Sequence, residues 1–594
     1  MQEFTSPGAV TIDPEVTVTD GLWKAESQHP NRSALSYRKG GTFVDVSTAE
    51  MASTVRRLAA GFMADGIQPG DRICLFAPSR IEFTYFDYAI WAAGAATVTI
   101  YETSSPDQVE WIVKDSGATA IVCANDDLAK VFEEKAGDLG TCEKVYIIDS
   151  GAMDQLSQAG QDITDEQVIE RARSVSQDDL ATLVYTSGTT GLPKGCHLTH
   201  KNFVSVIDNT VSVTGEVFRA GGSTLMFLPL AHIFARLVQV GAINEGVKIA
   251  FSTGIPNLLE ELAMVKPTFL FSVPRVFEKV YNGAVKKAED DGKGAIFSRA
   301  ADTAIAFAKQ SEAGKVGLGT KVLHTIFDRL VYSKLRTTLG GQADYAISGG
   351  AALGERLGYF FSGIGLTVLE GYGLTETSAA TTLNRPGDIQ VGSVGKPIPG
   401  VTVKIADDGE VLIKGPHVFA GYWNNPEATA EAITDGGWFH SGDIGTLDEN
   451  GFLRITGRKK ELIVTAGGKN VAPAVLEDRM RAHPLISQCM VVGDAQPFIA
   501  ALVTVDPDEF PRWADHNGKT APLAELTEDP DLRAAIQAAI DDANKTVSKA
   551  EAIKEFRILP VDFTIEGGEM TPTLKVKRKV VAEKYADALT SIYG

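Results

Sequence analysis

The stretch Tyr185–Gly195 combines the residue types that a loop needs in order to bind a polyphosphate. It reads Tyr-Thr-Ser-Gly-Thr-Thr-Gly-Leu-Pro-Lys-Gly, so it consists mainly of hydroxyls and glycines with one lysine. Glycines let backbone N–H groups approach phosphate oxygens, hydroxyls donate further hydrogen bonds, and Lys194 supplies a compact positive charge. We therefore predict a triphosphate site here, formed by Thr186, Ser187, Gly188, Thr189, Thr190, Gly191 and Lys194.

The familiar nucleotide loop G-x-x-x-x-G-K-[ST] does not describe this stretch. Counted from Gly188, its second glycine falls on Pro193, and Lys194 is followed by glycine rather than Ser or Thr. The triplet Gly518-Lys519-Thr520 fails as well, because Trp513 occupies the first glycine position. A plain Gly/Ser/Thr surface turn is the remaining alternative, and the length of the string disfavours it.

In residues and order, Tyr185–Gly195 resembles the phosphate-binding signature of the adenylate-forming (AMP-binding) superfamily, which includes acyl-CoA synthetases, peptide-synthetase adenylation domains and luciferases. Stretches similar to the family's other signatures follow in the expected order as far as Lys575, so the resemblance covers most of the chain. It implies an α/β fold with a large N-terminal domain, residues 1–456, of two parallel α/β sheets plus a small β-barrel. A small mobile α+β C-terminal domain, residues 457–594, is expected to follow.

The stretch Glu370–Glu376 (Glu-Gly-Tyr-Gly-Leu-Thr-Glu) resembles the family's second nucleotide signature. The resemblance implies that the aromatic ring presents its face to a purine, the threonine holds the α-phosphate and the last carboxylate holds Mg²⁺. A strand that ends in a glycine turn is the alternative interpretation. Upstream, small residues resemble the family's adenine-pocket turn, where the base lies on bare backbone. From these two stretches the expected nucleotide site comprises Gly349, Gly350, Ala351, Gly371, Tyr372, Gly373, Thr375 and Glu376.

Two further residues match the family's ribose site. Asp443, in the stretch His-Ser-Gly-Asp, resembles the aspartate that accepts hydrogen bonds from both sugar hydroxyls, and Arg458 resembles the ribose-contacting arginine. Alone, an aspartate after Ser-Gly is more often a turn residue. Lys460 falls where the family has its hinge residue, and Gly467-Gly468 is expected to admit the pantetheine arm of CoA past bare backbone.

The last motif, Thr571–Arg578, contains the candidate catalytic lysine. The family's usual pattern has glycine immediately before this lysine, whereas the present chain has Leu574 there, as expected in long-chain members. Lys575 is the best match to the catalytic position, and Lys577 is the near competitor. A solvated basic tail is the alternative without function.

Three further features concern the acyl substrate: one matches the family as a whole, and two resemble its fatty-acyl branch. His232, in Pro-Leu-Ala-His, stands where the family places a histidine near the acyl carboxylate, although a lone histidine is more often structural. The polar, helix-prone segment Phe277–Leu339 resembles a helical insert of the long-chain acyl-CoA synthetases. Asp435–Lys460 resembles the fatty-acyl signature.

The resemblance implies a long-chain fatty acid–CoA ligase that uses ATP, Mg²⁺ and coenzyme A. The acid would attack the α-phosphorus of ATP to give an acyl-adenylate and diphosphate, and the CoA thiol would then attack the acyl carbon. The residues expected to act in catalysis are Lys575, Glu376, Thr186 and His232. One alternative is an adenylating enzyme that loads a carrier-protein thiol, or an oxidative luciferase. The other, a nucleotide-binding module without catalysis, is disfavoured by the full set of charged residues.

Alternating strand and helix patterns surround these motifs. A capping-box sequence, Ser47-Thr48-Ala49-Glu50, opens an amphipathic helix that ends at Gly66. The strand–helix–strand order that follows favours parallel sheets, and the Asn450-Gly451 hairpin signal lies in a later region of short alternating strands, where we expect a small barrel or sandwich. The expected parallel strands are Arg72–Phe76, Ala96–Ile100, Ala120–Cys123, Val145–Ile148, Thr224–Leu228, Val247–Phe251 and Phe269–Val273.

Length and composition set the remaining limits. A chain of 594 residues is too long for one core, so two or more domains are expected, and a net charge of −20 argues against a nucleic-acid partner. The five cysteines are scattered without a Cys-x-x-Cys pair and indicate a reducing compartment. The N-terminus lacks the pattern of a signal peptide, and no long apolar run is present. The cytoplasm is the default location, and peripheral membrane contact stays open.

Overall fold

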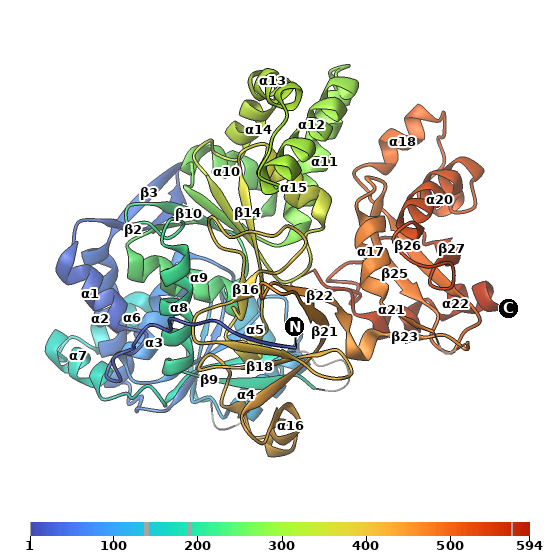
Figure 1. Ribbon diagram of the computed structural model, residues 1–594. Helices are drawn as coiled ribbons and strands as arrows, with labels where there is room; N and C mark the ends of the chain where they lie inside the picture. Colours follow the sequence, from blue (N-terminus) through green and yellow to red (C-terminus); the bar gives the residue numbers. More distant parts are fainter. Residues whose placement is uncertain (1, 136–139, 141, 187–191, 468, 572–573) are drawn as a thin grey trace.

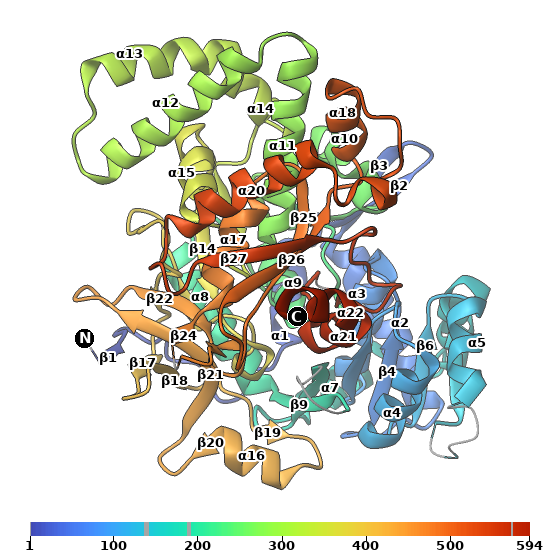
Figure 2. The ribbon, with the colours of Figure 1, turned by 90° about the vertical axis from the view of Figure 1, so that its right-hand side faces the viewer.

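The computed structural model describes residues 2–135, 140, 142–186, 192–467, 469–571 and 574–594. A large part with two mainly parallel sheets and an antiparallel sheet is followed by a smaller part that begins near Arg458 (Figures 1 and 2). This arrangement agrees with the expected fold class. Within the described residues, no helix is both long enough and apolar enough to span a lipid bilayer.

The first sheet has the order β19-β9-β8-β5-β4-β6-β7, with parallel pairing from β8 to β7. Strand β4 shows how its two faces are covered. Ile73 and Leu75 pack toward α2 (Thr48–Ala64) and α3 (Ile81–Ala92), whereas Cys74 and Phe76 pack toward α4 and α5, because side chains alternate along a strand. The remaining bounds are β4 (Arg72–Phe76), β5 (Ala96–Ile100), α4 (Pro106–Ser116), β6 (Ala120–Cys123), α5 (Asp126–Lys135), β7 (Lys144–Ile147), α6 (Ala152–Ala159), α7 (Asp165–Arg173), β8 (Leu180–Thr186), β9 (Lys194–Thr199) and β19 (Gly421–Tyr422).

The second sheet consists of two runs, β3-β2-β11-β10 and β12-β13-β14-β15-β16. They meet at a seam where the N–H of Thr268 donates to the carbonyl of Ser223 (2.8 Å) and the hydroxyl of Thr224 donates to the carbonyl of Phe269 (3.0 Å). The sheet therefore continues across the seam through a side-chain hydroxyl. Its strands are β2 (Ser33–Lys39), β3 (Thr42–Ser47), β10 (Ser223–Met226), β11 (Lys248–Phe251), β12 (Phe269–Ser272), β13 (Tyr345–Ser348), β14 (Thr367–Tyr372), β15 (Thr382–Leu383) and β16 (Lys396–Pro397).

Helices α8 (His200–Thr214) and α9 (Ile233–Glu245) share one apolar core with residues of both sheets. A fully buried ion pair fixes α9 there: Arg236 donates through Nε to Asp87 Oδ2 (3.0 Å) and through Nη2 to Oδ1 (2.5 Å). Thr97 and Gln239 donate to the same carboxylate. Since every partner is hydrogen-bonded, the pair can be kept without water.

The expected helical insert is present. Four helices and a short π-helix (Asp328–Tyr332) pack around an aromatic cluster that includes Tyr281, Phe297 and Phe360. They rise above the second sheet at the top of Figure 1. Their bounds are α11 (Pro274–Asp290), α12 (Gly294–Glu312), α13 (Leu318–Phe327) and α14 (Ser333–Thr338), next to α10 (Leu258–Val265) and α15 (Glu355–Gly363).

The region beyond Gln390 forms an antiparallel sheet of order β1-β17-β18-β21-β20, with β22 paired to β21. Where a barrel or sandwich was expected, the described strands form this sheet, and its first strand comes from the N-terminus. Asn450-Gly451 lies in the β21–β22 connection, and Gly451 has a φ of +86°. The bounds are β1 (Glu3–Thr5), β17 (Thr402–Ile405), β18 (Glu410–Lys414), α16 (Pro426–Ala432), β20 (Ile433–Thr434), β21 (Trp438–Leu447) and β22 (Leu453–Arg458).

The smaller part has its own sheet, β25-β26-β27, and its own apolar core. It contacts the insert mainly through charged side chains. Arg275 of α11 donates to Asp506 (3.3 Å), and Lys286 Nζ lies 3.6 Å from Glu509 Oε1. Arg512 of the small part forms an ion pair with Glu289. The bounds are β23 (Ile463–Val464), β24 (Asn470–Val471), α17 (Pro473–Arg481), β25 (Ile486–Val492), β26 (Ile499–Val505), α18 (Phe510–His516), α20 (Pro530–Asn544), β27 (Ile553–Ile558), α21 (Arg578–Lys584) and α22 (Ala586–Tyr593).

Candidate active site

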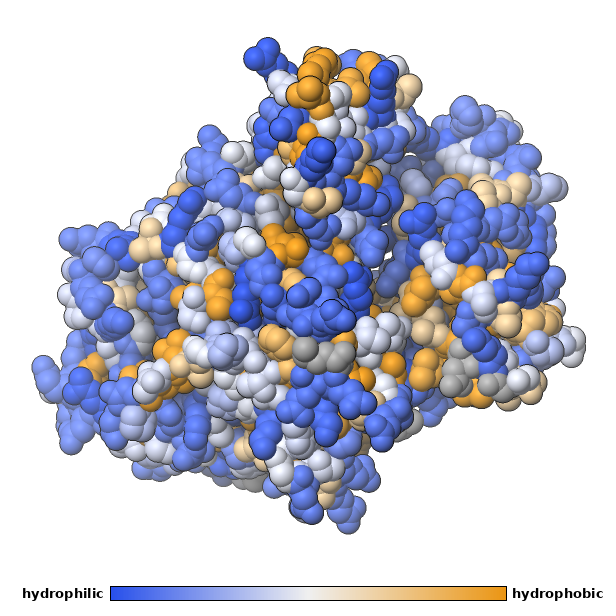
Figure 3. Space-filling view, in the orientation of Figure 1, coloured by the Kyte–Doolittle hydropathy of each residue, from blue (hydrophilic) through white to orange (hydrophobic). Residues whose placement is uncertain are grey.

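A cleft of about 2910 Å³ lies between the large and small parts and is lined by both. Figure 3 shows the surface hollowed between them. Most of the predicted site residues that the structure describes line this cleft. Those residues are Thr186, Lys194, His232, Gly349, Gly350, Ala351, Gly371, Tyr372, Gly373, Thr375, Glu376, Asp443, Arg458, Lys460 and Lys575.

The two ends of the predicted phosphate loop are paired residues of an antiparallel hairpin. Thr186 ends β8 and lies opposite Lys194, which begins β9. A helix follows only at His200, so a strand pair supports the loop where many nucleotide loops have a helix N-terminus. Trp111 donates to the carbonyl of Pro193 (2.8 Å) and thereby anchors one end. The intervening residues Ser187, Gly188, Thr189, Thr190 and Gly191 lie outside the described part of the chain.

Lys194 and Glu376 meet on either side of one tyrosine that sequence reasoning did not find. The ammonium of Lys194 lies 5.0 Å from the ring centroid of Tyr422, and the hydroxyl of Tyr422 donates to Glu376 Oε1 (2.8 Å). Tyr422 belongs to the two-residue strand β19, which is too short to show any periodicity in the sequence. The lysine and the carboxylate are therefore positioned relative to each other by a shared aromatic side chain.

The residues predicted for the base lie at neighbouring strand ends. Gly349-Gly350-Ala351 follows β13, and Tyr372 ends the adjacent strand β14, in a sheet where Ser348 pairs with Glu370. Gly350 has a φ of +86°, which favours glycine. A Cβ at Gly373 would lie 1.9 Å from the carbonyl oxygen of Ala379, so only glycine fits there.

Asp443 and Arg458, fifteen positions apart in the chain, are cross-strand partners of β21 and β22. Arg458 Nε lies 3.1 Å from Asp443 Oδ1, and the hydroxyl of Tyr372 donates to Oδ2 (2.7 Å). Asp443 is nearly fully buried, so these two partners offset the cost of keeping its carboxylate charged. The predicted purine-binding and ribose-binding residues thus form one hydrogen-bonded unit.

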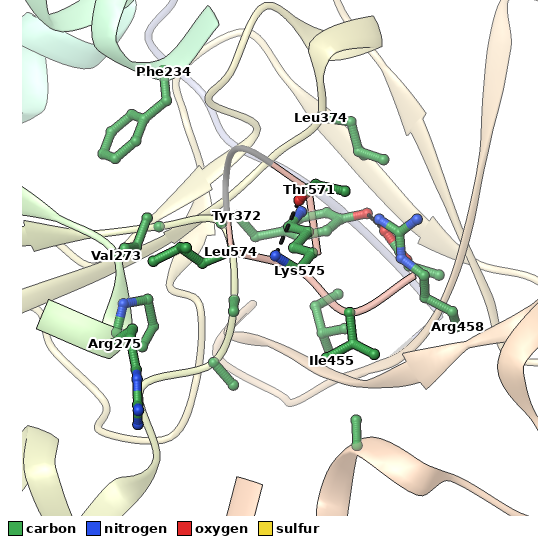
Figure 4. A pocket seen from close by; sticks show the side chains of 18 of the residues that line it. Phe234, Val273, Arg275, Tyr372, Leu374, Ile455, Arg458, Thr571, Leu574 and Lys575 are labelled. Carbon is green, nitrogen blue, oxygen red and sulfur yellow. Dashed lines mark hydrogen bonds and ion pairs between the residues drawn. The ribbon is translucent and has the colours of Figure 1, made fainter. Parts of the chain in front are cut away.

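Lys575 of the small part lies beside these residues. Figure 4 shows its side chain beside Tyr372 and Arg458. Its backbone N–H is held by the hydroxyl of Thr571 (3.0 Å). The side chain is open to the space of the cleft but deeply enclosed by protein, and this burial, together with Arg458, lowers the pKa of Lys575. Lys577 also lines the cleft, at the N-terminus of α21.

Leu574, which stands where the family has glycine, has a φ of +60°. This left-handed backbone conformation explains the family's preference, because glycine adopts it without a steric cost. The side chain of Leu574 points into the cleft toward Val273 (Figure 4). Leu574 therefore adopts a backbone conformation that suits glycine, and it adds an apolar side chain beside the lysine.

His232 caps α9, where its Nδ1 accepts from the N–H of Phe234 (3.2 Å). Burial, and to a lesser extent the charge of Lys575, lower its pKa to about 4, so the ring is neutral at pH 7. Apolar side chains form part of the lining of the same cleft, among them Ile207, Val211, Phe218, Phe227, Phe234 and Val238.

Two predicted features lie apart from this group. Gly467 is exposed in the β23–β24 turn and is absent from the described lining of the cleft, and Gly468 lies outside the described residues.

Glu370, to which the sequence analysis assigned no role, is buried at the cleft wall and accepts from the N–H of Leu353 (3.1 Å). Burial raises its pKa to about 7. Its position in the second nucleotide signature was the only sequence signal for it.

Comparison with families of known proteins gives two matches that span most of the chain. Residues 22–423 match the AMP-binding enzyme family, and residues 460–594 match the AMP-binding enzyme C-terminal domain. Long-chain-fatty-acid–CoA ligase FadD15 of Mycobacterium bovis is 49% identical over the whole of both chains. Peroxisomal long chain acyl-CoA synthetase 7 of Arabidopsis thaliana is 30% identical over 96% of this chain and 84% of its own.

Solved structures with the same fold are more distant in sequence. The adenylation domain of a carboxylate reductase from Mycobacterium chelonae has a TM-score of 0.76 at 22% identity, covering 98% of this chain and 91% of its own. The anthranilate CoA ligase AuaEII in complex with anthranoyl-AMP has a TM-score of 0.73 at 19% identity, covering 98% and 99%.

Proposed function

The chain belongs to the AMP-binding enzyme family, and on this premise we propose that it is a long-chain fatty acid–CoA ligase. It converts a fatty acid, ATP and CoA to acyl-CoA, AMP and diphosphate through an acyl-adenylate. The full-length similarity to FadD15, a long-chain-fatty-acid–CoA ligase, supports the substrate class. The aliphatic and aromatic side chains in the lining of the cleft also support it, because such a lining suits an acyl tail.

One observation carries the mechanism: Lys575 lines the same cleft as His232 and the Asp443–Arg458 pair. In the proposed complex the acid carboxylate lies by His232 and the ribose by Asp443. The ammonium of Lys575 then faces both the attacking carboxylate and the α-phosphate. A fixed positive charge at this point stabilises the negative charge that develops there in the transition state.

In the first half-reaction, a carboxylate oxygen of the fatty acid attacks the α-phosphorus of ATP. A new P–O bond forms to the acyl group, the bond to the bridging oxygen of diphosphate breaks, and diphosphate leaves with that electron pair. We assign Thr186 and Lys194, with the loop between them, to the β- and γ-phosphates, and Thr375 to the α-phosphate. Catalysis of this kind depends mainly on position and charge neutralisation.

In the second half-reaction, the sulfur of CoA attacks the acyl carbon, AMP leaves, and the thiol proton is released. We propose that the small part turns about Lys460 between the two steps, which moves Lys575 away and brings Gly467 and Gly468 to the cleft. Gly467 is absent from the present lining of the cleft, whereas Lys575 is part of it. Because the residues assigned to the two steps do not line the cleft together, this supports two arrangements of the small part. In this proposal the chain divides after residue 456, and residues 457–594 form the part that turns.

The donor set at Glu376 fits Mg²⁺ bound together with ATP. Groups of three or more metal-ligating side chains are absent from the described residues, and Mg²⁺ commonly takes one or two carboxylates with phosphate oxygens and water. Glu376 accepts from Tyr422 at one oxygen, and a carboxylate keeps further acceptor sites. When bound, Mg²⁺ would neutralise phosphate charge. Tyr422 holds the carboxylate in position for it.

A reducing cellular location is part of the proposal. All five cysteines are free and buried, which suits the cytoplasm, where disulfides are rare. Contact with a membrane surface is considered separately below.

The function is tested by product analysis across acids of increasing chain length. With MgATP, CoA and a long-chain fatty acid, the protein should form acyl-CoA, AMP and diphosphate. Acetate and benzoate should react far more slowly, because they contact little of the apolar lining of the cleft. Formation of ADP and phosphate would contradict the adenylate mechanism, and equal turnover of acetate would contradict the substrate class. Transfer only to a phosphopantetheinyl protein would assign a different acceptor.

A further inference from the structure

The outer face of α13 and of the π-helix that continues it is an exposed aliphatic stripe. Its residues recur at every fourth position, so each lies next to the following one on the helix surface. Their exposed fractions are 82% for Leu318, 60% for Val322, 47% for Ile326 and 53% for Leu330. These four residues are called the α13 stripe below. Figure 3 shows apolar side chains at the top of the molecule, where Figure 1 places α13.

The inner face of the same helix is already packed. Phe327 and Tyr332 are buried in the core of the insert, Leu323 packs against it, and the ring of His324 stacks on Phe307 at 3.8 Å. A surface helix of a globular protein usually has one apolar and one polar face. Since α13 is apolar on both faces, its stripe is not needed for packing within this chain and is typical of a contact surface.

Basic residues are interspersed with the α13 stripe along the chain and flank it on both sides. Residues 313–341 contain five basic residues and one acidic residue, Asp328, in a chain whose net charge is −20. Within the described residues, Arg336 pairs with Asp328, and the other four form no ion pair. Those four, all exposed, are Lys315, Lys321, Arg329 and Lys334. The region is therefore a local positive surface on an acidic protein.

We propose that the α13 stripe docks on the anionic surface of a lipid membrane. An interfacial helix combines an apolar face, which enters the acyl boundary, with Lys and Arg that reach anionic headgroups. The rest of this acidic chain is repelled by such a surface, so the insert would approach it first. A second copy of the chain is a poorer occupant, because the four unpaired basic residues of each copy would face those of the other. The proposal rests on this surface alone and does not depend on the reaction.

Vesicle flotation tests the proposal with the full-length protein. The probes are phosphatidylcholine vesicles with and without phosphatidylglycerol. The protein should float with the anionic vesicles and much less with the neutral ones. Removing a buried aliphatic side chain should weaken binding about tenfold, so Leu318→Ser combined with Val322→Ser should lose about a hundredfold. Lys321→Ala and Arg329→Ala should each lose about fivefold, and binding should weaken with salt.

A matched control is Val561→Ser, which removes an aliphatic side chain of similar exposure, 53%, from the small part. It should bind vesicles like the unaltered protein. Failure of the unaltered protein to bind anionic vesicles would overturn the proposal, as would equal binding by the stripe variant. A dimer that the stripe variant loses in sedimentation would show that a second copy covers the stripe instead. If the double serine variant does not fold, the two lysine and arginine variants decide, and full binding by both would refute the proposal.

Discussion

Replacing Lys575 by alanine should separate the two half-reactions. Lys575 lines the same cleft as Asp443, Arg458, Glu376 and His232. It is therefore placed to act while negative charge develops between the acid carboxylate and the α-phosphate. In the proposed rotated arrangement it leaves the cleft, so thioester formation should not require it.

The expected loss follows from the surroundings of the ammonium. Two unit charges about 4 Å apart interact with roughly 4 kcal/mol at the effective dielectric constant of a partly enclosed site. Loss of one pre-positioned group of this kind commonly costs about 10² to 10³ in rate. Lys575→Ala should thus slow acyl-adenylate formation, measured by diphosphate release from ATP and fatty acid, by about that factor. Acylation of CoA from supplied acyl-adenylate should stay within about threefold.

Lys577→Ala is the matched control. Lys577 lines the same cleft two residues along, and its backbone N–H donates to Glu569 (2.7 Å), a contact that the substitution keeps. Neither half-reaction should change by more than a few-fold. Equal loss of both half-reactions in Lys575→Ala would refute the assignment, and loss of adenylation in Lys577→Ala alone would transfer the role to that residue.

Three further predictions concern metal binding, acid stability and backbone strain. Glu376→Gln should raise the Mg²⁺ concentration needed for adenylation at least tenfold. The melting temperature should stay within a few degrees, because the amide oxygen can still accept from Tyr422. An unchanged Mg²⁺ requirement would contradict the assignment. Burial lowers the pKa of five histidines: His200 and His232 to about 4, His417 to about 3, and also those of His197 and His483. The free energy of unfolding should therefore have its full value above about pH 6.5 and decrease as the pH drops toward 4, because only the unfolded chain takes up these protons in that range. Denaturant midpoints that stay constant over this range would refute the prediction. Leu574→Gly should keep adenylation within about threefold, as its φ of +60° suits glycine, and a loss as large as that of Lys575→Ala would show that the leucine side chain itself is required.

Local patterns were sufficient to predict the central strands. Arg72–Phe76 and Ala96–Ile100 were predicted with the bounds that the structure has, because both are short apolar runs between turn residues. The capping box at Ser47–Glu50 is present as predicted, with both of its hydrogen bonds. These features depend on near neighbours in the chain, which is why sequence alone reveals them.

Features that depend on distant contacts were not predictable in the same way. Tyr422, which positions Lys194 and Glu376, belongs to a two-residue strand that exists only because it pairs with β9. The pairing of Asp443 with Arg458 was expected from family resemblance and not from any local pattern. The antiparallel sheet receives β1 from the far end of the chain, and no local signal specifies that pairing.

The contact between the insert and the small part has a consequence for how readily the two parts can separate. In Arg275–Asp506 both side chains are only 15% exposed, whereas Lys286–Glu509 and Arg512–Glu289 are more exposed ion pairs. Each of the more exposed pairs contributes about 0–1 kcal/mol, and salt screens it. The proposed turn of the small part breaks these ion pairs. The share of molecules in each arrangement should then depend on the ionic strength of the medium as well as on the bound ligand.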